Sequence, residues 1–494
     1  MNNFRKILFL VVVVAFSSCE DLEINDNPNK VSQTHPELLL TNIVTSAFQV
    51  KGTGAMYASR MIVQTDGESS SQFYKWDRAS FDAYNSLRQV TKMMEEAERI
   101  SDNSYLGIGH FFRAYYFYDL ALTFGDIPYT EALKGETEDL YQPKYSTQEE
   151  VFVGILEELK KANSLLDDSN IISGDPIYNG DVSKWRKLVN SFRLKVLLTL
   201  SKKAGNLSLN IRNEFASIYN SLPIIATPEE SARLEFVDVV DSRYTEFNSS
   251  GYGSGLYMAS TFIDMLKERE DPRLFAISGQ TKNAKEAGLA IDDFNAYAGG
   301  NPTDPYNDVN LLAAAGKVSK VNERYTKDPT TEAHNLLSFS EVQFILAEAA
   351  VRGWISSVSA QIYYENGIKA NFQFYNTYAK GYEEYYTQSK AVDYISGAMV
   401  NFINANTEDE KLELVITQKY LTSFLQGGWR MYFDHLKTGF PVFPYLGTNT
   451  PPTRWIYPVD EYNNNAENVT EAISRQFGSA SNDGIREVTW WLKQ

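Results

Sequence analysis

The sequence predicts a mainly α-helical fold in which helices pack in pairs, with little β structure. Apolar residues recur at intervals of three and four over long stretches, and three hydroxyl–carboxylate pairs have the spacing of a helical capping box. Hydrophobic residues make up 43% of the 494 residues, which is ample for a large core. We therefore expect one extended helical body and not a set of small domains.

Seven stretches have the length and spacing of helices. The stretch 146–167 places Phe152, Ile155 and Leu159 on one face, whereas 104–124 carries two apolar stripes and is expected to be buried between neighbours. Their lengths suit helix-turn-helix units of the tetratricopeptide type. The seven stretches are about 80–100, 104–124, 146–167, 183–203, 338–353, 357–376 and 408–425.

Residues typical of helix starts mark four N-termini. Pro36 suits a first helical turn, because proline lacks the N–H group that would have no partner there. Three further starts are expected to carry a capping box, formed by Ser146 with Glu149, Ser338 with Glu341, and Thr407 with Glu410.

The first residues have the layout of an export signal. Arg5 and Lys6 precede an unbroken apolar run at 7–16, and two small residues follow it. Ten apolar residues reach about 15 Å as a helix, half of the roughly 30 Å that a membrane-spanning helix must cross. We therefore predict a lipoprotein signal peptide at residues 1–18 and not a membrane span.

Cys19 is the only cysteine of the chain. A single thiol cannot form a disulfide within its own chain, so a different role is expected in an exported protein. The residues before it resemble a bacterial lipobox, in which the signal is cut before a cysteine that carries acyl chains, although Phe16 stands where that motif usually has Leu. Two or more acyl chains make a stable anchor. The alternative is an unmodified secreted protein with an inert cysteine.

Composition divides the mature chain into a tether and one domain. Residues 19–35 are polar and are predicted to be a flexible tether between the lipid and the fold. Residues 36–494 are predicted to form a single domain. Within it, the region 222–335 has short segments and clusters of Gly, Pro, Asn and Asp, which is typical of a functional loop region inside a helical body.

Charge and aromatic content narrow the range of partners. The formal net charge is −17 at pH 7, so we do not expect a nucleic acid as a partner. The chain contains 31 Tyr and 28 Phe. A surface rich in aromatic rings suits sugars, whose apolar faces stack on the rings, and it suits peptides as well.

Motifs for catalysis or for a cofactor are absent from the sequence. The chain has no H-E-x-x-H, G-x-S-x-G or P-loop motif, and its four histidines have no metal-ligand spacing. We therefore expect no enzyme activity, no metal and no cofactor. Two alternatives stay open. A surface glycoside hydrolase needs only two carboxylates about 5–9.5 Å apart, and a helical-repeat scaffold binds other proteins.

Six segments, in order along nearly the whole chain, resemble the SusD/RagB type of nutrient-binding outer-membrane lipoprotein. "RAYYFYDLALTFGDIPYTEAL" (113–133) is similar to the aromatic helix of that family with its Gly-Asp-Ile-Pro turn, and "SEVQFILAEAAVRGW" (340–354) resembles its Ala-Glu-Ala helix. The other four are "ITQKYLTSFLQGGWRMYFDHLKTGFP" (416–441), "RYTEF" (243–247), "DPRL" (271–274) and "RWIYPVDEYNNN" (454–465).

This resemblance implies both a fold and a role. The implied fold is an α-superhelix of four tetratricopeptide-like units that supports a loop-rich ligand-binding subdomain. The implied role is that of a lipid-anchored protein on the cell-surface side of the outer membrane. Such a protein binds a glycan, an oligosaccharide or a peptide and hands it to a SusC-like TonB-dependent transporter. Members of this family are not known as enzymes.

The predicted ligand site lies on loops. Phe73, Tyr74 and Trp76 fall within four positions of the stretch 65–84 and follow no helical period. The resemblance places a ligand-stacking aromatic loop at this point of the chain. The alternative is that Trp76 folds back onto the body and anchors the loop. Weaker candidates for the opposite wall are Tyr244 and Tyr252 in the loop 241–257, and Tyr297 and Tyr306 in the loop 294–308.

Overall fold

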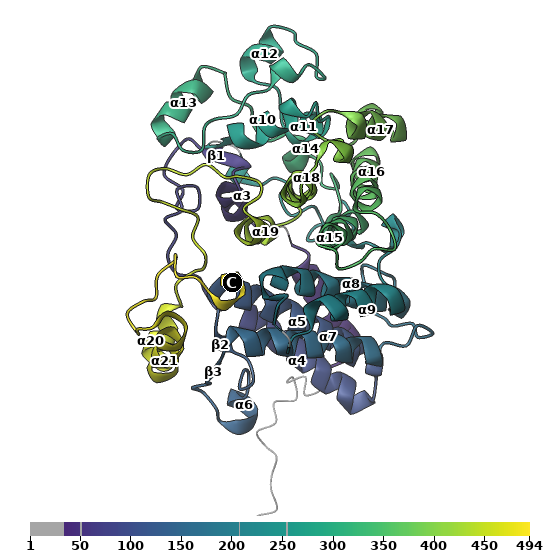
Figure 1. Cartoon of the computed structure of the whole chain (residues 1–494), viewed down its shortest axis with the longest axis vertical. Helices are drawn as coiled ribbons and strands as arrows, with labels where there is room; N and C mark the ends of the chain where they lie inside the picture. Colours follow the sequence, from purple (N-terminus) through teal and green to yellow (C-terminus); the bar gives the residue numbers. More distant parts are fainter. Residues whose placement is uncertain (1–33, 50–51, 207, 253–254) are drawn as a thin grey trace, which may run out of the picture.

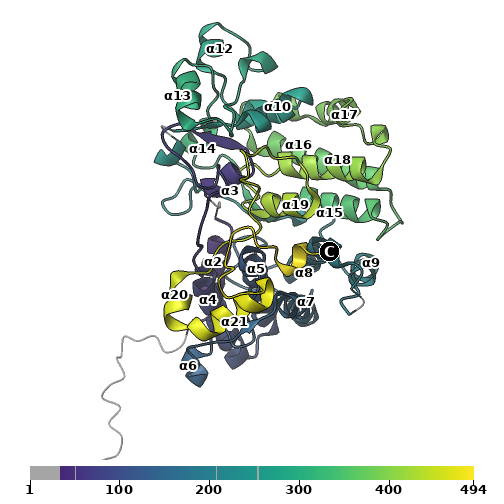
Figure 2. The same cartoon turned by 60° about the vertical axis from the view of Figure 1, so that its left-hand side comes forward.

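The computed structural model describes residues 34–49, 52–206, 208–252 and 255–494. The signal peptide predicted at 1–18, Cys19 and most of the tether predicted at 19–35 lie outside these residues. The described part is mainly helical, as predicted, and its helices form two stacked layers (Figures 1 and 2).

The first layer contains the N-terminal helices, drawn in purple and blue in Figure 1. Helix α5 packs against α4 and α7, and both of its apolar stripes are buried, as the sequence predicts. Pro36 opens the first of these helices, also as predicted. The elements are α2 (Pro36–Ala47), α4 (Ala83–Ile100), α5 (Asn103–Phe124), α6 (Gly135–Glu138), α7 (Gln148–Leu165), α8 (Val182–Thr199), η1 (Leu200–Lys203) and α9 (Ile211–Ser221).

The second layer contains the green helices of Figure 1. Helix α15 packs against α16 and α18, and it also contacts α8 of the first layer. Helices α15 and α16 cross closely at Gly367, where a Cβ atom would lie 2.7 Å from Cε1 of Phe344. The elements are α15 (Phe339–Val351), α16 (Ala360–Tyr378), η5 (Glu383–Tyr386), α17 (Gln388–Ser396), η6 (Phe402–Asn404), α18 (Glu408–Leu421) and α19 (Arg430–Thr438).

Short elements form the loop-rich part of the molecule, and most of them lie above the second layer in Figure 1. The segment Thr53–Ala58 contributes α3 to this part. The region 222–335 contributes η2 (Pro228–Glu230), η3 (Ser250–Tyr252), α10 (Ser260–Glu268), α11 (Arg273–Ile277), α12 (Lys282–Glu286), η4 (Phe294–Ala296), α13 (Tyr306–Ala314) and α14 (Arg324–Lys327).

The described residues contain three sheets, each of two short antiparallel strands. In the first, Ile62 pairs with Met258 and Gln64 with Leu256, which ties the N-terminal part of the chain to the loop-rich region. The pairs are β1 (Ile62–Gln64) with β5 (Leu256–Met258), β2 (Ile127–Pro128) with β3 (Tyr145–Ser146), and β4 (Ala232–Leu234) with β6 (His334–Leu337).

The C-terminal segment folds back onto the first layer. Helices α20 (Val459–Asn464) and α21 (Ala466–Phe477), in yellow, lie beside the first layer in Figures 1 and 2, and η7 (Trp490–Leu492) follows them. The Arg454 guanidinium is fully buried, and its Nε donates to the carbonyl of Phe124 at 3.1 Å. Within the described ranges, no helix has both the length and the apolar character needed to cross a bilayer.

Of the three predicted capping boxes, one is confirmed, one keeps its hydroxyl cap while the Glu341 carboxylate pairs with Lys195 and Arg430, and one is shifted by one residue. Thr407 and Glu410 form a capping box, and the Ser338 hydroxyl accepts from the amide of Glu341. The start of α7 is different, because Thr147 and not Ser146 is the N-cap, and its partner is Glu150 and not Glu149. Ser146 pairs with Ile127 in the β2–β3 sheet, and this pairing keeps it out of the helix.

We expect Thr147→Ala to lower the free energy of unfolding by about 1 kcal/mol, the usual loss when an N-cap hydroxyl is removed. The reason is that the Thr147 Oγ1 accepts from the amide of Glu150 at 3.2 Å, while the Glu150 carboxylate accepts from the amide of Thr147 at 2.8 Å. Urea denaturation of the domain measures the change, with Ser146→Ala as the matched control. A larger loss for Ser146→Ala would contradict the observed cap.

Candidate functional site

The aromatic loop predicted to bind a ligand is folded against the body of the protein. The side chain of Trp76 is only 6% exposed, and its ring stacks on that of Trp455 with centroids 4.8 Å apart. Its Nε1 donates to the carbonyl of Arg454 at 3.1 Å. The ring of Trp429 packs edge to face against that of Trp76, with centroids 5.4 Å apart. This placement corresponds to the alternative interpretation, in which Trp76 anchors the loop.

Tyr74 is fully buried beside it. Its hydroxyl donates to the carbonyl of Ala58 at 2.9 Å, and the guanidinium of Arg60 lies 3.9 Å from the centre of its ring. Burial raises the pKa of the Tyr74 phenol above its ordinary value. Phe73 is the partly exposed ring of the three, with the Lys75 ammonium 5.7 Å from its centre.

The structure brings together the three loops that were predicted to surround the ligand. The amide of Thr65 donates to the carbonyl of Gly255 at 2.8 Å, and Nε2 of Gln72 donates to the carbonyl of Pro302 at 3.0 Å. Most of their predicted rings, however, face inward. Tyr244, Tyr252 and Tyr297 are buried, whereas Tyr306 is partly exposed at the start of α13. Contact of these rings with a ligand stays a prediction.

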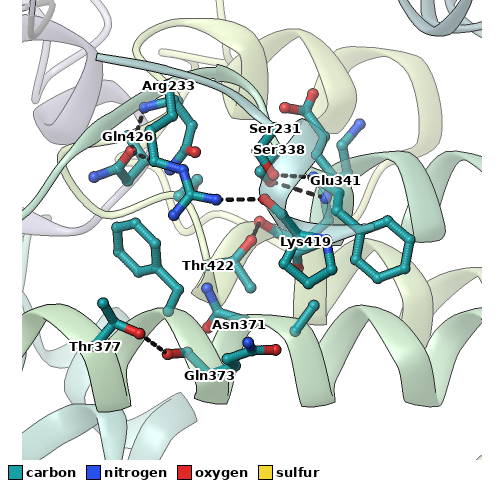
Figure 3. Close-up of a pocket in the computed structure, with 18 of the residues that line it drawn as sticks. Ser231, Arg233, Ser338, Glu341, Asn371, Gln373, Thr377, Lys419, Thr422 and Gln426 are labelled. Carbon is teal, nitrogen blue, oxygen red and sulfur yellow. Dashed lines mark hydrogen bonds between the residues drawn. The ribbon is translucent and has the colours of Figure 1, made fainter. Parts of the chain in front are cut away.

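A polar cleft of about 370 Å³ lies elsewhere, beside the sheet β4–β6 and between helices α15, α16 and α18 (Figure 3). Its lining combines uncharged hydrogen-bonding side chains with a smaller number of charged and apolar ones. Those with the clearest roles are Ser231, Ser338, Asn371, Thr377, Thr422 and Gln426. None of the predicted aromatic site residues lines this cleft.

The hydroxyl groups of the cleft are fixed by the backbone. Ser231 Oγ accepts from the amide of Phe339 at 2.9 Å, and Ser338 Oγ accepts from the amide of Glu341 at 3.1 Å (Figure 3). Thr422 Oγ1 donates to the carbonyl of Lys419 at 2.8 Å. Each hydroxyl can both donate one hydrogen bond and accept two, so all of them keep capacity for a ligand.

The side-chain amides of the cleft are also held in defined orientations. The Oδ1 of Asn371 accepts from Nη1 of Arg273 at 3.0 Å, and Arg273 is completely buried behind α16. Because the oxygen of Asn371 faces that core arginine, its Nδ2 group faces away from it. The Oε1 of Gln426 accepts from the backbone amide of Asn335 at 2.9 Å, which holds Gln426 against β6.

Charged groups at the inner end of the cleft belong to a buried ionic network. Nζ of Lys419 donates to Asp434 Oδ2 at 2.6 Å. Glu341 lies between Lys195 of α8, at 2.5 Å, and Arg430 of α19, at 3.5 Å. Two of the three cations that line the cleft, Lys419 and Arg430, are thus paired with carboxylates.

The pKa values in this network follow from burial and from the partners. Burial raises the pKa of Asp434, but the adjacent Lys419 and Lys437 outweigh this effect and hold the pKa below its ordinary value. Burial lowers the pKa of Lys195 to about 7, although Glu341 opposes the shift.

Two of the histidines, His110 and His435, are packed into the helical body. Nδ1 of His110 is hydrogen-bonded to Glu158 on the neighbouring helix α7. Burial lowers the pKa of His435 to about 4, and its Nδ1 lies 2.8 Å from the carbonyl oxygen of Pro441. Across the described residues, no group of three or more His, Cys, Asp or Glu side chains is arranged to hold a metal ion.

Sequence reasoning missed the cleft. A signal was available on α16, since the stretch 371–377 contains amides, a hydroxyl and aromatic rings but no charged residue. A helix face in open solvent is usually rich in Lys and Glu. The other walls come from 228–235, 335–341 and 419–431, and their proximity depends on tertiary packing.

Comparison with known proteins identifies the family to which the chain belongs. A family model described as "Starch-binding associating with outer membrane" matches residues 28–458. The chain belongs to this SusD-like family. It is therefore a protein associated with the outer membrane, from a family of binding proteins rather than enzymes. No curated protein sequence matches the chain.

Solved structures agree with this SusD-like assignment. An outer-membrane protein of Bacteroides vulgatus, described in connection with nutrient binding, is 47% identical with a TM-score of 0.90, over 93% of this chain and 100% of that protein. A SusD homologue of Bacteroides fragilis is also 47% identical, with a TM-score of 0.89 over 94% and 100% of the two chains. A second homologue from that organism is 31% identical, with a TM-score of 0.85 over 93% and 100%.

We expect Trp76→Ala to lower the free energy of unfolding by about 3–5 kcal/mol, because it removes a buried indole from an aromatic cluster. Phe73→Ala, in the same loop but partly exposed, is the matched control and is expected to cost about 1 kcal/mol or less. Thermal and urea denaturation measure both. An unchanged melting temperature for Trp76→Ala would show that the ring is not an anchor.

Proposed function

We propose that this SusD-like protein is a surface lipoprotein that binds a nutrient and delivers it to a SusC-like TonB-dependent transporter. The nutrient is a glycan, an oligosaccharide or a peptide. The observation that carries the proposal is the family match over 28–458, because the family is described as starch-binding and associated with the outer membrane. The relative at 47% identity, described as an outer-membrane protein connected with nutrient binding, supports the same role.

The lipid on Cys19 is the proposed attachment to the membrane. The chain has sixteen residues between Cys19 and Pro36, where the first described helix starts. A segment of that length spans at most about 55 Å. Such a tether leaves room for the domain to sit over a membrane protein while the lipid stays in the bilayer.

The two faces of the protein have different proposed roles. The paired helices of the two layers, which were predicted to be tetratricopeptide-like, dock on the transporter, since repeated helix pairs present an extended surface to a partner. The ligand is then enclosed between the two proteins. Phe73 and Tyr306 are the proposed contacts of the loop-rich part, because they are the predicted rings that keep exposed surface. The protein binds its ligand without turning it over.

We expect Cys19→Ala to leave the fold intact and to release the protein from membranes, because the thioether-linked lipid can no longer form. Partition into a detergent phase and recovery in the membrane fraction measure the change. Ser32→Ala, in the predicted tether, is the control and is expected to behave as the wild type. If Cys19→Ala still partitions with the wild type, the lipid is not on this residue.

The transporter is expected to copurify with the full-length protein. A C-terminally tagged chain, purified in mild detergent from its native outer membrane, is expected to recover a large β-barrel protein that mass spectrometry identifies. An unrelated tagged outer-membrane lipoprotein, treated in the same way, controls for nonspecific recovery. Repeated isolation of the chain alone would count against a function as the lid of a transporter.

A further inference from the structure

We propose that the polar cleft beside β4–β6 is a binding site for one neutral, polyhydroxylated ring, the size of a single sugar unit. This inference rests on the proposed function, since the ring is a part of the nutrient or a small saccharide related to it. The site is separate from the aromatic loops, and none of the predicted ligand residues lines it.

The first argument is the shape of the cleft. Its volume of about 370 Å³ falls in the lower part of the range of about 300–1,000 Å³ that is usual for small-molecule sites. Its walls come from the segment 228–235 and from helices α15, α16 and α18, so they are held by the core of the second layer. A preformed cleft loses little entropy when a ligand binds.

The second argument is the distribution of hydrogen-bonding capacity. The hydroxyls of Ser231 and Ser338 each accept one backbone N–H, which leaves their own O–H groups to donate. Thr422 and Thr377 donate to helix carbonyls, which leaves their lone pairs to accept. A ligand that both donates and accepts around its whole edge fits this arrangement, and a ring of hydroxyl groups has that property.

Asn371 gives the cleft a directed donor. The side chain is 6% exposed, its oxygen is occupied by Arg273, and the residue lines the cleft. Its Nδ2 group, on the other side of the amide, is directed away from Arg273 and can donate to a ligand. A donor held in one orientation in this way suits a ligand oxygen at this point of the cleft. Figure 3 shows Asn371 between Thr422 and Gln373.

The third argument is electrostatic, and it favours a neutral ligand over an ion. Lys419 is held by Asp434 at 2.6 Å, and Arg430 by Glu341 at 3.5 Å. Arg233, in β4 itself, donates to the Tyr378 hydroxyl at 3.2 Å and to the carbonyl of Pro228. At Lys419 and Arg430 an anionic ligand has to compete with carboxylates that are already in place, and Glu229 and Glu235, which also line the cleft, repel an anion.

The cleft also offers apolar surface, which suits the C–H face of a sugar ring. Phe374 and Met431 line the cleft together with the polar groups, and Phe374 is partly exposed. Sugar rings have an apolar face formed by their C–H groups, and such a face packs well on an aromatic ring. A cleft with hydroxyls and amides around an aromatic ring therefore suits a sugar better than it suits a fully polar ion.

The test blocks the cleft with a bulky side chain introduced at one of its lining residues. Ala370 of α16 lines the cleft, so Ala370→Trp places an indole inside it. Ile362→Trp, on the same helix at a position that is 51% exposed, is the matched control. Thr422→Val is a second variant, which keeps the side-chain shape and removes one hydroxyl. The probes are the neutral sugars glucose, galactose, mannose, xylose and N-acetylglucosamine. Glucuronate tests binding of an ionic sugar, and trialanine tests binding of a peptide.

Saturation-transfer NMR and calorimetric titration measure binding to the folded proteins. We expect at least one neutral sugar to bind the wild type and Ile362→Trp, to lose saturable binding with Ala370→Trp, and to bind roughly ten-fold more weakly with Thr422→Val. Equal affinity for the wild type and Ala370→Trp would overturn the proposal, and so would binding of glucuronate or trialanine alone.

Measurements on the same preparations distinguish a failure of this proposal from a failure of the proposed function. Retention of a polymeric glycan and recovery of the barrel are measured on the wild type alongside the sugars. If the wild type retains polymer or barrel but binds no neutral sugar in the cleft, the cleft proposal is wrong and the function stands. If the wild type retains no polymer, no peptide and no barrel, the proposed function itself is wrong.

Discussion

The relative position of the two helical layers depends on one buried ionic network. It lies where α8 of the first layer meets α15, α18 and α19 of the second: Lys195 and Glu341 pair across the layers at 2.5 Å, and Lys437 and Glu348 pair within the second layer at 2.9 Å. Removal of one partner from a buried pair typically costs about 3–5 kcal/mol, because the other charge is left alone in a medium of low polarity. The network therefore fixes how the layers meet, and the inner end of the polar cleft is fixed with them.

The loop-rich part is held by a different means. Strand β1 pairs with β5 across nearly two hundred residues, and Gln72 reaches the carbonyl of Pro302. Below these contacts, rings from distant segments pack edge to face, with Trp76 and Tyr432 at a centroid distance of 5.3 Å. Loops that would otherwise be mobile are thus attached to a rigid aromatic core, which is how a scaffold of helices gives binding residues defined positions.

Local sequence patterns were sufficient to predict the helices but not to predict the candidate site. The pattern at 338–353 identified α15 because its cap and its apolar period agree. The cap of α7 was displaced because Ser146 and Thr147 stand together, as do Glu149 and Glu150, and both registers satisfy the local rule. Only the pairing of Ser146 with Ile127 decides between them. Trp76 could not be assigned to the interior from its neighbours, since the ring that covers it, Trp455, is almost four hundred residues away.

The return of the C-terminal segment to the first layer also determines the order in which the protein can fold. Arg454 binds the end of α5, Tyr457 stacks on Phe124 at 5.6 Å, and the amide of Trp491 donates to Gln148 at 3.0 Å. The N-terminal helices therefore lack part of their core until residues 454–491 have docked on them. Contacts of such long sequence separation form slowly, because a long loop must close before they gain any free energy. The earliest-made part of this protein is among the last to be completed.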